Sequence, residues 1–96
     1  MIVQQDFLRL LSQAYNEVRK MIKDFDDLPI KAQLVLIDMT FNLGLGGLLK
    51  FENMLDAIEC RDWEKASEEL LDSRYAIQTK RRARLNAAFL LSCSEV

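Results

Sequence analysis

The scarcity of turn-forming residues limits what this chain can fold into more than any other feature of its sequence. Three glycines and one proline are spread over 96 residues. A chain with so few turn formers is usually helical, and no segment alternates between apolar and polar residues as a half-buried strand does. We therefore predict an all-α fold, a single compact helical domain of about five or six helices that spans residues 1–96.

The first predicted helix is long and covers residues 4–25, within an amphipathic segment that we assign to residues 1–27. A helix of that length extends about 30 Å, so we expect one end to project or to contact a partner. Asp26 and Asp27 follow it and are expected to cap the next helix rather than to act as catalytic carboxylates. The helical stripe repeats at alternating spacings of four and three, at Phe7, Leu11, Ala14, Val18, Met21 and Phe25.

The second predicted helix is almost entirely apolar and covers residues 29–43. Pro29 suits its first turn because proline lacks the N–H that would be unpaired there. Lys31, Asp38 and Asn42 lie on a narrow polar edge. A helix that is apolar nearly all round is typically buried on most sides, so we expect this one to form the centre of the domain.

The remaining segments also show a helical pattern. Gly44 suits a left-handed C-cap, so residues 43–47 are expected to turn into a third helix over residues 48–59. Asp62 is expected to cap a fourth helix, and residues 73–78 to form a turn or a single helical turn. Thr79 is expected to be the N-cap residue of the last helix, which is expected to end near residue 92. The residues expected to face the core are Leu48, Phe51, Met54, Leu55, Ile58, Trp63, Ala66, Leu70, Leu71, Ala83, Ala87, Leu90 and Leu91.

The composition excludes several classes of chemistry. The chain has no histidine, which removes Ser-His and Cys-His nucleophile pairs and most zinc sites, so no metal or cofactor is predicted. Acids outnumber bases by 15 to 13, so the chain has no overall positive field for nucleic acid. Cys60 and Cys93 do not form a disulfide framework and are expected to be free thiols.

No targeting segment is recognised in the sequence. Asp6 and Arg9 interrupt the apolar residues near Met1, which excludes a signal peptide there. No stretch reaches the ~20 apolar residues of a membrane span. We therefore expect synthesis in the cytoplasm and no membrane span.

Charges are unevenly distributed near the C-terminus. Residues 52–72 contain eight acids and two bases, whereas residues 74–84 contain five bases and no acid. Cations at the start of a helix oppose its dipole. Two interpretations stay open: a solvated face balanced by Glu68, Glu69 and Asp72, or an anion-facing rim that holds a carboxylate of another segment.

Several segments together resemble phage-type lysozymes, the muramidase endolysins. Residues 38–44, DMTFNLG, resemble a helix end in that family. Further similar segments follow in the same order, at residues 48–58, 61–66, 70–75, 78–79 and 82–84. The resemblance covers residues 28–92 and implies the helical C-terminal lobe of a lysozyme. Residues 1–27 are similar in position, but not in sequence, to the long helix that joins the two lobes.

The resemblance also implies residue roles. In the family, this lobe faces a cleft that holds the glycan strands of peptidoglycan in the bacterial cell wall. By resemblance, the substrate-binding residues are Asn42, Arg74, Tyr75 and Gln78, with Tyr75 at a position that usually holds Trp. Arg82 matches an arginine that pairs with the catalytic glutamate, and a guanidinium suits such a carboxylate clamp.

The chain departs from the family in lacking the N-terminal lobe with the catalytic Glu and its partners. No catalytic residue is therefore predicted, and Arg82 is expected to find no carboxylate in its own chain. Three hypotheses stay open. The chain is half of a split muramidase that works with a separate catalytic lobe, or a non-enzymatic binding or regulatory module, or an enzyme assembled by self-association with Glu17 or Glu52 as acid. A homodimer through the first helix would cover apolar surface left open by the missing lobe.

Overall fold

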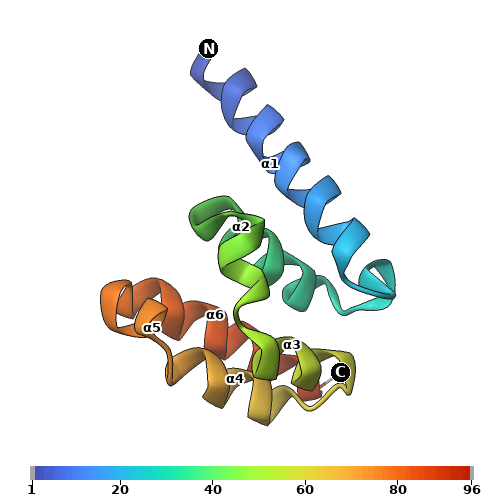
Figure 1. Cartoon of the computed structure of the whole chain (residues 1–96), viewed down its shortest axis with the longest axis vertical. Helices are drawn as coiled ribbons and strands as arrows, with labels where there is room; N and C mark the ends of the chain where they lie inside the picture. The colour runs from blue at the N-terminus through green and yellow to red at the C-terminus, as the bar shows by residue number, and fades with distance from the viewer. Residues whose placement is uncertain (1, 96) are drawn as a thin grey trace.

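The all-α prediction is confirmed by a computed structural model, which describes residues 2–95 and the side chains of residues 8–73 and 76–94. Within residues 2–95 there are six α-helices, two short 3-10 helices and no strand (Figure 1). The elements are α1 (Ile2–Met21), η1 (Phe25–Asp27), α2 (Ile30–Leu49), α3 (Glu52–Glu59), α4 (Trp63–Leu71), α5 (Arg74–Gln78), α6 (Lys80–Ser92) and η2 (Cys93–Glu95).

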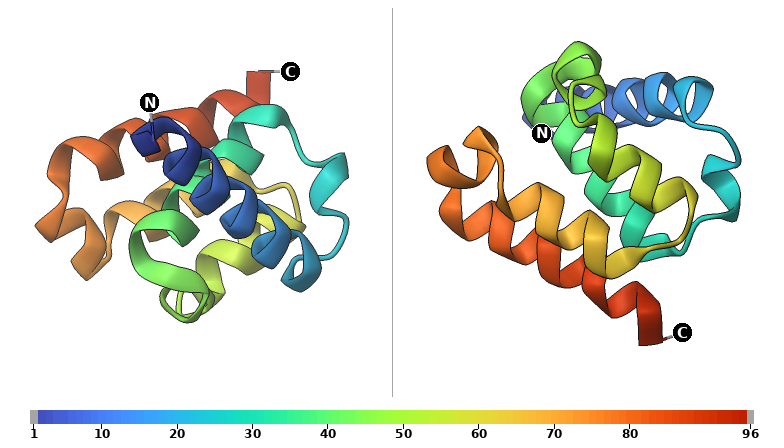
Figure 2. Two further views of the ribbon diagram at one scale, coloured as in Figure 1. Left: turned by 90° about the horizontal axis from the view of Figure 1, so that it is seen from above. Right: turned by 60° about the horizontal axis from the view of Figure 1, so that its bottom comes forward.

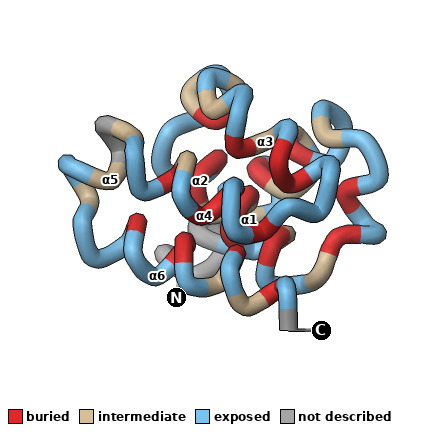
Figure 3. Tube along the Cα trace, turned by 90° about the horizontal axis from the view of Figure 1, so that it is seen from below, coloured by how far each residue is buried: buried red, intermediate tan, exposed pale blue. Residues whose placement is uncertain are grey.

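The helices form two groups that α2 connects. α1 packs along one side of α2, and its N-terminal end extends beyond the other helices (Figure 1). On the other side, α4 and α6 run side by side, with α5 as the corner between them (Figure 2). The buried residues lie where these helices meet, as the red segments of Figure 3 show. They include Val18, Phe25, Leu36, Met39, Leu48, Met54, Ile58, Trp63, Leu70, Ala83 and Leu90.

The expectation that α2 is buried on most sides is wrong. One face, which includes Leu36 and Met39, is completely buried. The opposite face is open, because Ile30 is 67% and Leu34 51% exposed. A domain this small has too few helices to surround α2. The expectation that no stretch has the length and apolar character of a membrane span is also wrong: within the described residues α2 has both, as core helices of globular proteins can.

Gly44 interrupts α2 instead of ending it. The left-handed C-cap predicted for Gly44 requires a positive φ, and its φ of 76° agrees with this. Its ψ of 163°, however, lies outside the left-handed helical region. Nothing lies within 4 Å of where a Cβ would stand, so the backbone conformation is the reason for glycine here. The helix resumes up to Leu49, and α3 therefore begins at Glu52 rather than at Leu48 as predicted.

The first helix ends four residues earlier than predicted, at Met21. Asp24 adopts a left-handed conformation with φ 57°, which directs Phe25 into the core from η1. No side chain caps η1 or α2, so the expected capping by aspartate is wrong there. Asp26 instead bonds back to α1: the hydroxyl of Tyr15 donates to its carboxylate at 3.0 Å, and Nε of Arg19 lies 3.2 Å from it.

The prediction for α4 is largely confirmed. The carboxylate of Asp62 caps the helix by accepting a hydrogen bond from the backbone N–H of Lys65 at 3.3 Å. Leu70 is buried, whereas Leu71 is 46% exposed, contrary to expectation. Successive side chains of an α-helix point about 100° apart, so Leu70 and Leu71 cannot both lie on the buried face of α4.

In α6, Ala83, Ala87 and Leu90 are buried as predicted, whereas Leu91 is 46% exposed, for the same geometric reason as Leu71. Thr79 occupies the position before the helix but makes no side-chain cap hydrogen bond.

We expect Leu36→Ala to lower the free energy of unfolding by about 2–5 kcal/mol, because it leaves a cavity beside a fully buried helix face. Leu34→Ala on the same helix is the matched control, and should cost less than about 1 kcal/mol because Leu34 is half exposed. Urea unfolding followed by circular dichroism measures both. Equal losses for the two variants would contradict the packing of α2.

Both cysteines are free, but they lie in different surroundings, with Cys60 exposed and Cys93 buried. Burial raises the pKa of the Cys93 thiol, whose sulfur also lies 3.4 Å from the carbonyl oxygen of Phe89. A raised pKa lowers the thiolate fraction near neutral pH, and thiolate is the reactive form. We expect a thiol reagent at pH 8 to label Cys60 rapidly and Cys93 only after urea is added. Equally rapid labelling of both in the folded protein, resolved by mass spectrometry, would contradict this.

Candidate functional site

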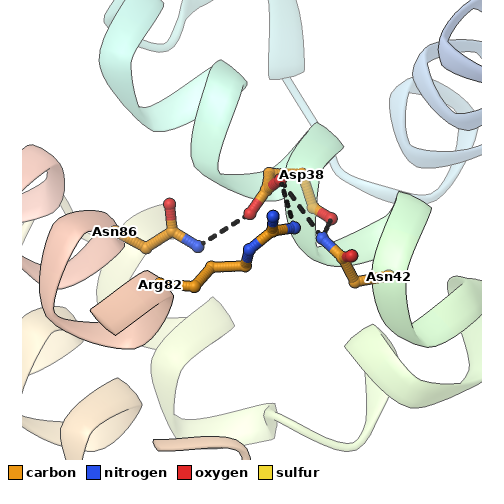
Figure 4. Close-up of polar contacts among 4 residues, drawn as sticks. All are labelled: Asp38, Asn42, Arg82 and Asn86. Atoms are coloured by element: carbon orange, nitrogen blue, oxygen red, sulfur yellow. Dashed lines mark hydrogen bonds and ion pairs between the residues drawn. The ribbon is translucent and has the colours of Figure 1, made fainter. Parts of the chain in front are cut away.

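The carboxylate of Asp38 is the centre of a polar network between α2 and α6 (Figure 4). Nη1 of Arg82 donates to Oδ1 at 3.2 Å, and Nδ2 of Asn86 donates to Oδ2 at 3.0 Å. Nδ2 of Asn42 donates to Oδ1 at 3.1 Å and to the backbone oxygen of Asp38 at 2.7 Å. The expectation that Arg82 finds no carboxylate in its own chain is therefore wrong.

Helical spacing brings these four residues together. Asp38 and Asn42 are one turn apart on α2, as Arg82 and Asn86 are on α6, so each pair shares a helix face. Asn86 is buried, whereas the side chains of Asp38 and Arg82 are 37% and 47% exposed. The network is thus anchored in the core at Asn86 and accessible to solvent at Arg82.

The structure brings together only part of the site that the resemblance implied. Asn42 and Arg82 meet at Asp38. Gln78 is exposed and lines a different hollow. The side chains of Arg74 and Tyr75 lie outside those that the structure describes.

An open groove lies beside the network, between α1, α2 and α6, with a volume of about 740 Å³. Its lining is mostly apolar, and among the described side chains that line it Asp38 is the one carboxylate. We call the cationic residues along its edge, Lys80, Arg81 and Arg82, the basic rim. The apolar lining residues are Leu11, Leu34, Ile37, Leu85 and Phe89.

A second hollow, of about 530 Å³, lies among α3, α4 and α5 and includes Gln78 and Phe51. Its lining also holds three acids, Glu52, Glu69 and Asp72. Within the part of the chain that the structure describes, no three acids or cysteines are grouped closely enough to hold a metal ion.

Among the described residues, no ion pair joins the basic rim to Glu68, Glu69 or Asp72. In the described residues, the two ion pairs are Arg19 with Asp26 and Arg82 with Asp38. Neither involves Glu68, Glu69 or Asp72, so the balance expected between these solvated acids and the cations of α6 is not made through ion pairs and stays a prediction.

The described part of the groove provides hydrogen-bond donors and one carboxylate. Hydrolysis by a pair of carboxyl groups needs one of them to donate a proton to the leaving oxygen. Asp38 is the single carboxylate in the described lining of the groove, and it accepts hydrogen bonds from the side chains of three residues. Donors on both oxygens hold the Asp38 carboxylate in place beside Arg82.

The sequence reasoning missed Asp38 and Asn86 as members of the site. The signal that points to them is the repeated spacing of four: Asp38 with Asn42, and Arg82 with Asn86. Such spacing places two polar side chains on one face of each helix. The face of α2 carries an acid, Asp38, and the face of α6 carries a base, Arg82, so the two faces are complementary in charge.

Comparisons with known proteins give one partial match. A stretch of 51 residues is 47% identical to the pre-baseplate central spike protein Gp5 of Enterobacteria phage T4. The match covers 53% of this chain but 9% of that protein, so the chain spans a small part of its relative. No family model matches the chain. No solved structure matches it. The similarity relates the chain to phage proteins.

We expect Asp38→Ala to lower the free energy of unfolding by about 1–3 kcal/mol, because the buried amide of Asn86 loses a hydrogen bond to a charged acceptor. Asp26→Ala removes an exposed ion pair with Arg19 and an exposed hydrogen bond from Tyr15, and should cost about 0–1 kcal/mol. Thermal unfolding of both variants tests the difference. A smaller loss for Asp38→Ala than for Asp26→Ala would show that the network does not join α2 to α6.

Proposed function

We propose that this chain is a lysozyme-like helical lobe that serves peptidoglycan degradation in the bacterial cell wall, with the catalytic lobe supplied from outside these 96 residues. The proposal is supported by the ordered resemblance to the C-terminal lobe of phage-type lysozymes. The partial similarity to a phage spike protein is consistent with it.

The observation that carries the proposal is the convergence of Asn42 and Arg82. The resemblance assigns these residues to the cleft side of the lobe, and they lie on two different helices. Both donate to the same carboxylate oxygen of Asp38, at the edge of the groove. Arg82 is half exposed, so its guanidinium is open to a carboxylate that approaches from outside the chain.

A second candidate function is a non-enzymatic binding or regulatory module. It is favoured by the same contact, because Asp38 already supplies Arg82 with an anionic partner. In a split enzyme, Arg82 exchanges this partner for a carboxylate of the catalytic lobe. In a regulatory module, the Asp38 contact is permanent.

Two assays with purified peptidoglycan sacculi test the proposal. We expect the chain alone to release no reducing sugar, because the described lining of its groove holds a single carboxylate, and to co-sediment with sacculi at low salt. The double variant Asn42→Ala with Gln78→Ala should weaken sedimentation several-fold. Asn16→Ala, an exposed asparagine on α1, is the matched control and should sediment like the native chain.

Release of reducing sugar by the chain alone would contradict the absence of catalytic groups. Failure of the native chain to sediment would contradict peptidoglycan as its ligand. Unfolding midpoints of all variants, measured in parallel, separate loss of binding from loss of fold.

A further inference from the structure

The two charged members of the network between α2 and α6 are held very differently. Asp38 is held on both oxygens: Asn42 donates to Oδ1 at 3.1 Å, and the buried Asn86 donates to Oδ2 at 3.0 Å. The guanidinium of Arg82 has five N–H donors, yet among the described side chains its one acceptor is Asp38, at 3.2 Å. If the two separate, Asp38 therefore stays in place on its amide donors, whereas Arg82 is free to turn.

The contact between Arg82 and Asp38 is also weak enough to open. The two side chains are 47% and 37% exposed, and water and salt screen an ion pair in such a position. Lys80 and Arg81, which precede Arg82, are exposed and make no ion pair within the described residues. When Arg82 leaves Asp38, the basic rim therefore offers three neighbouring cations, a setting that suits an anion such as a carboxylate.

We propose that Asp38 is a tethered competitor that limits the binding of external carboxylates to Arg82. A group fixed beside its partner acts at a high effective concentration, which a dilute free ligand does not match. A carboxylate then displaces Asp38 only when a docked partner also presents it at high local concentration. The inference deepens the proposed function and rests on it for the identity of that partner. The competition itself is a property of these 96 residues and is tested without any partner.

The ion pair of Arg19 with Asp26 provides a matched comparison within the chain. Its N–O distance is also 3.2 Å, and its side chains are 54% and 56% exposed. It joins α1 to η1, and neither residue lines the groove. Neutralising Asp26 therefore changes the net charge of the chain as neutralising Asp38 does, but away from the basic rim.

Titration of the full chain with sodium acetate tests the proposal. The NMR signal of the Arg82 Nε–H group, assigned by its loss in Arg82→Lys, is followed while acetate replaces chloride at constant ionic strength. We expect a weak, saturable shift in the native chain. Asp38→Asn keeps the size of the side chain without its charge, and should bind acetate about two- to fivefold more tightly, the range expected for a partly exposed ion pair. Asp26→Asn should leave the acetate affinity at Arg82 unchanged.

A second measurement uses the native chain, so it does not depend on how well Asp38→Asn folds. The side-chain amide signals of Asn86 report whether Asp38 remains in place. We expect acetate to shift the Arg82 signal and to leave the Asn86 signals nearly unchanged, because Asn86 keeps its hydrogen bond to Asp38 when Arg82 turns away.

Four outcomes would overturn the proposal. Equal acetate affinity in the native chain and in Asp38→Asn would show that Asp38 does not compete. A gain of the same size in Asp26→Asn would reduce the effect to net charge. The absence of a saturable shift would show that Arg82 does not bind a carboxylate. Asn86 signals that move together with that of Arg82 would show that Asp38 is not held in place. The sacculi assays contain no acetate and measure sedimentation, so failure here leaves the proposed function separately decidable.

Discussion

The packing of one face of α2 is the constraint on which the rest of the structure depends. α2 contacts α1 on one side and α3 and α6 on the other, so it is the element that joins α1 to the α4–α6 pair. Leu36 and Met39 are completely buried at this junction. Burial of a large apolar side chain contributes about 1.5–3 kcal/mol, so a few such contacts supply stability of the size that holds a small domain together.

The same constraint explains why the domain has an open groove. A chain of 96 residues buries a limited share of its surface, and α2 has more apolar faces than its neighbours can cover. The face with Ile30 and Leu34 stays in solvent, whereas Asp38 is positioned to meet α6. The face of α2 that is buried in the core and the face that is exposed along the groove therefore belong to the same helix. The groove is a consequence of packing α2 through one face only.

Much of the fold could be predicted from the sequence because helical periodicity is a local property. The cap of α4 at Asp62 and the buried Trp63, Ala66 and Leu70 follow from spacing within one segment. The exposure of Leu34 did not follow, because it depends on how many helices surround α2. The pairing of Arg82 with Asp38 was missed for a similar reason: sequence spacing identifies a helix face, but not the face of another helix that lies against it.

The Asp38–Arg82 contact also limits which forces can hold a partner in the groove. Both side chains are partly exposed, and ion pairs in such positions contribute about 0–1 kcal/mol. A partner carboxylate that displaced Asp38 would exchange one weak pair for another and gain little affinity. For the catalytic lobe of the proposed function, most of the affinity would then have to come from contacts other than this ion pair. Asn86 is buried and donates to the other oxygen of Asp38, so Asp38 keeps a hydrogen-bond donor when Arg82 leaves it.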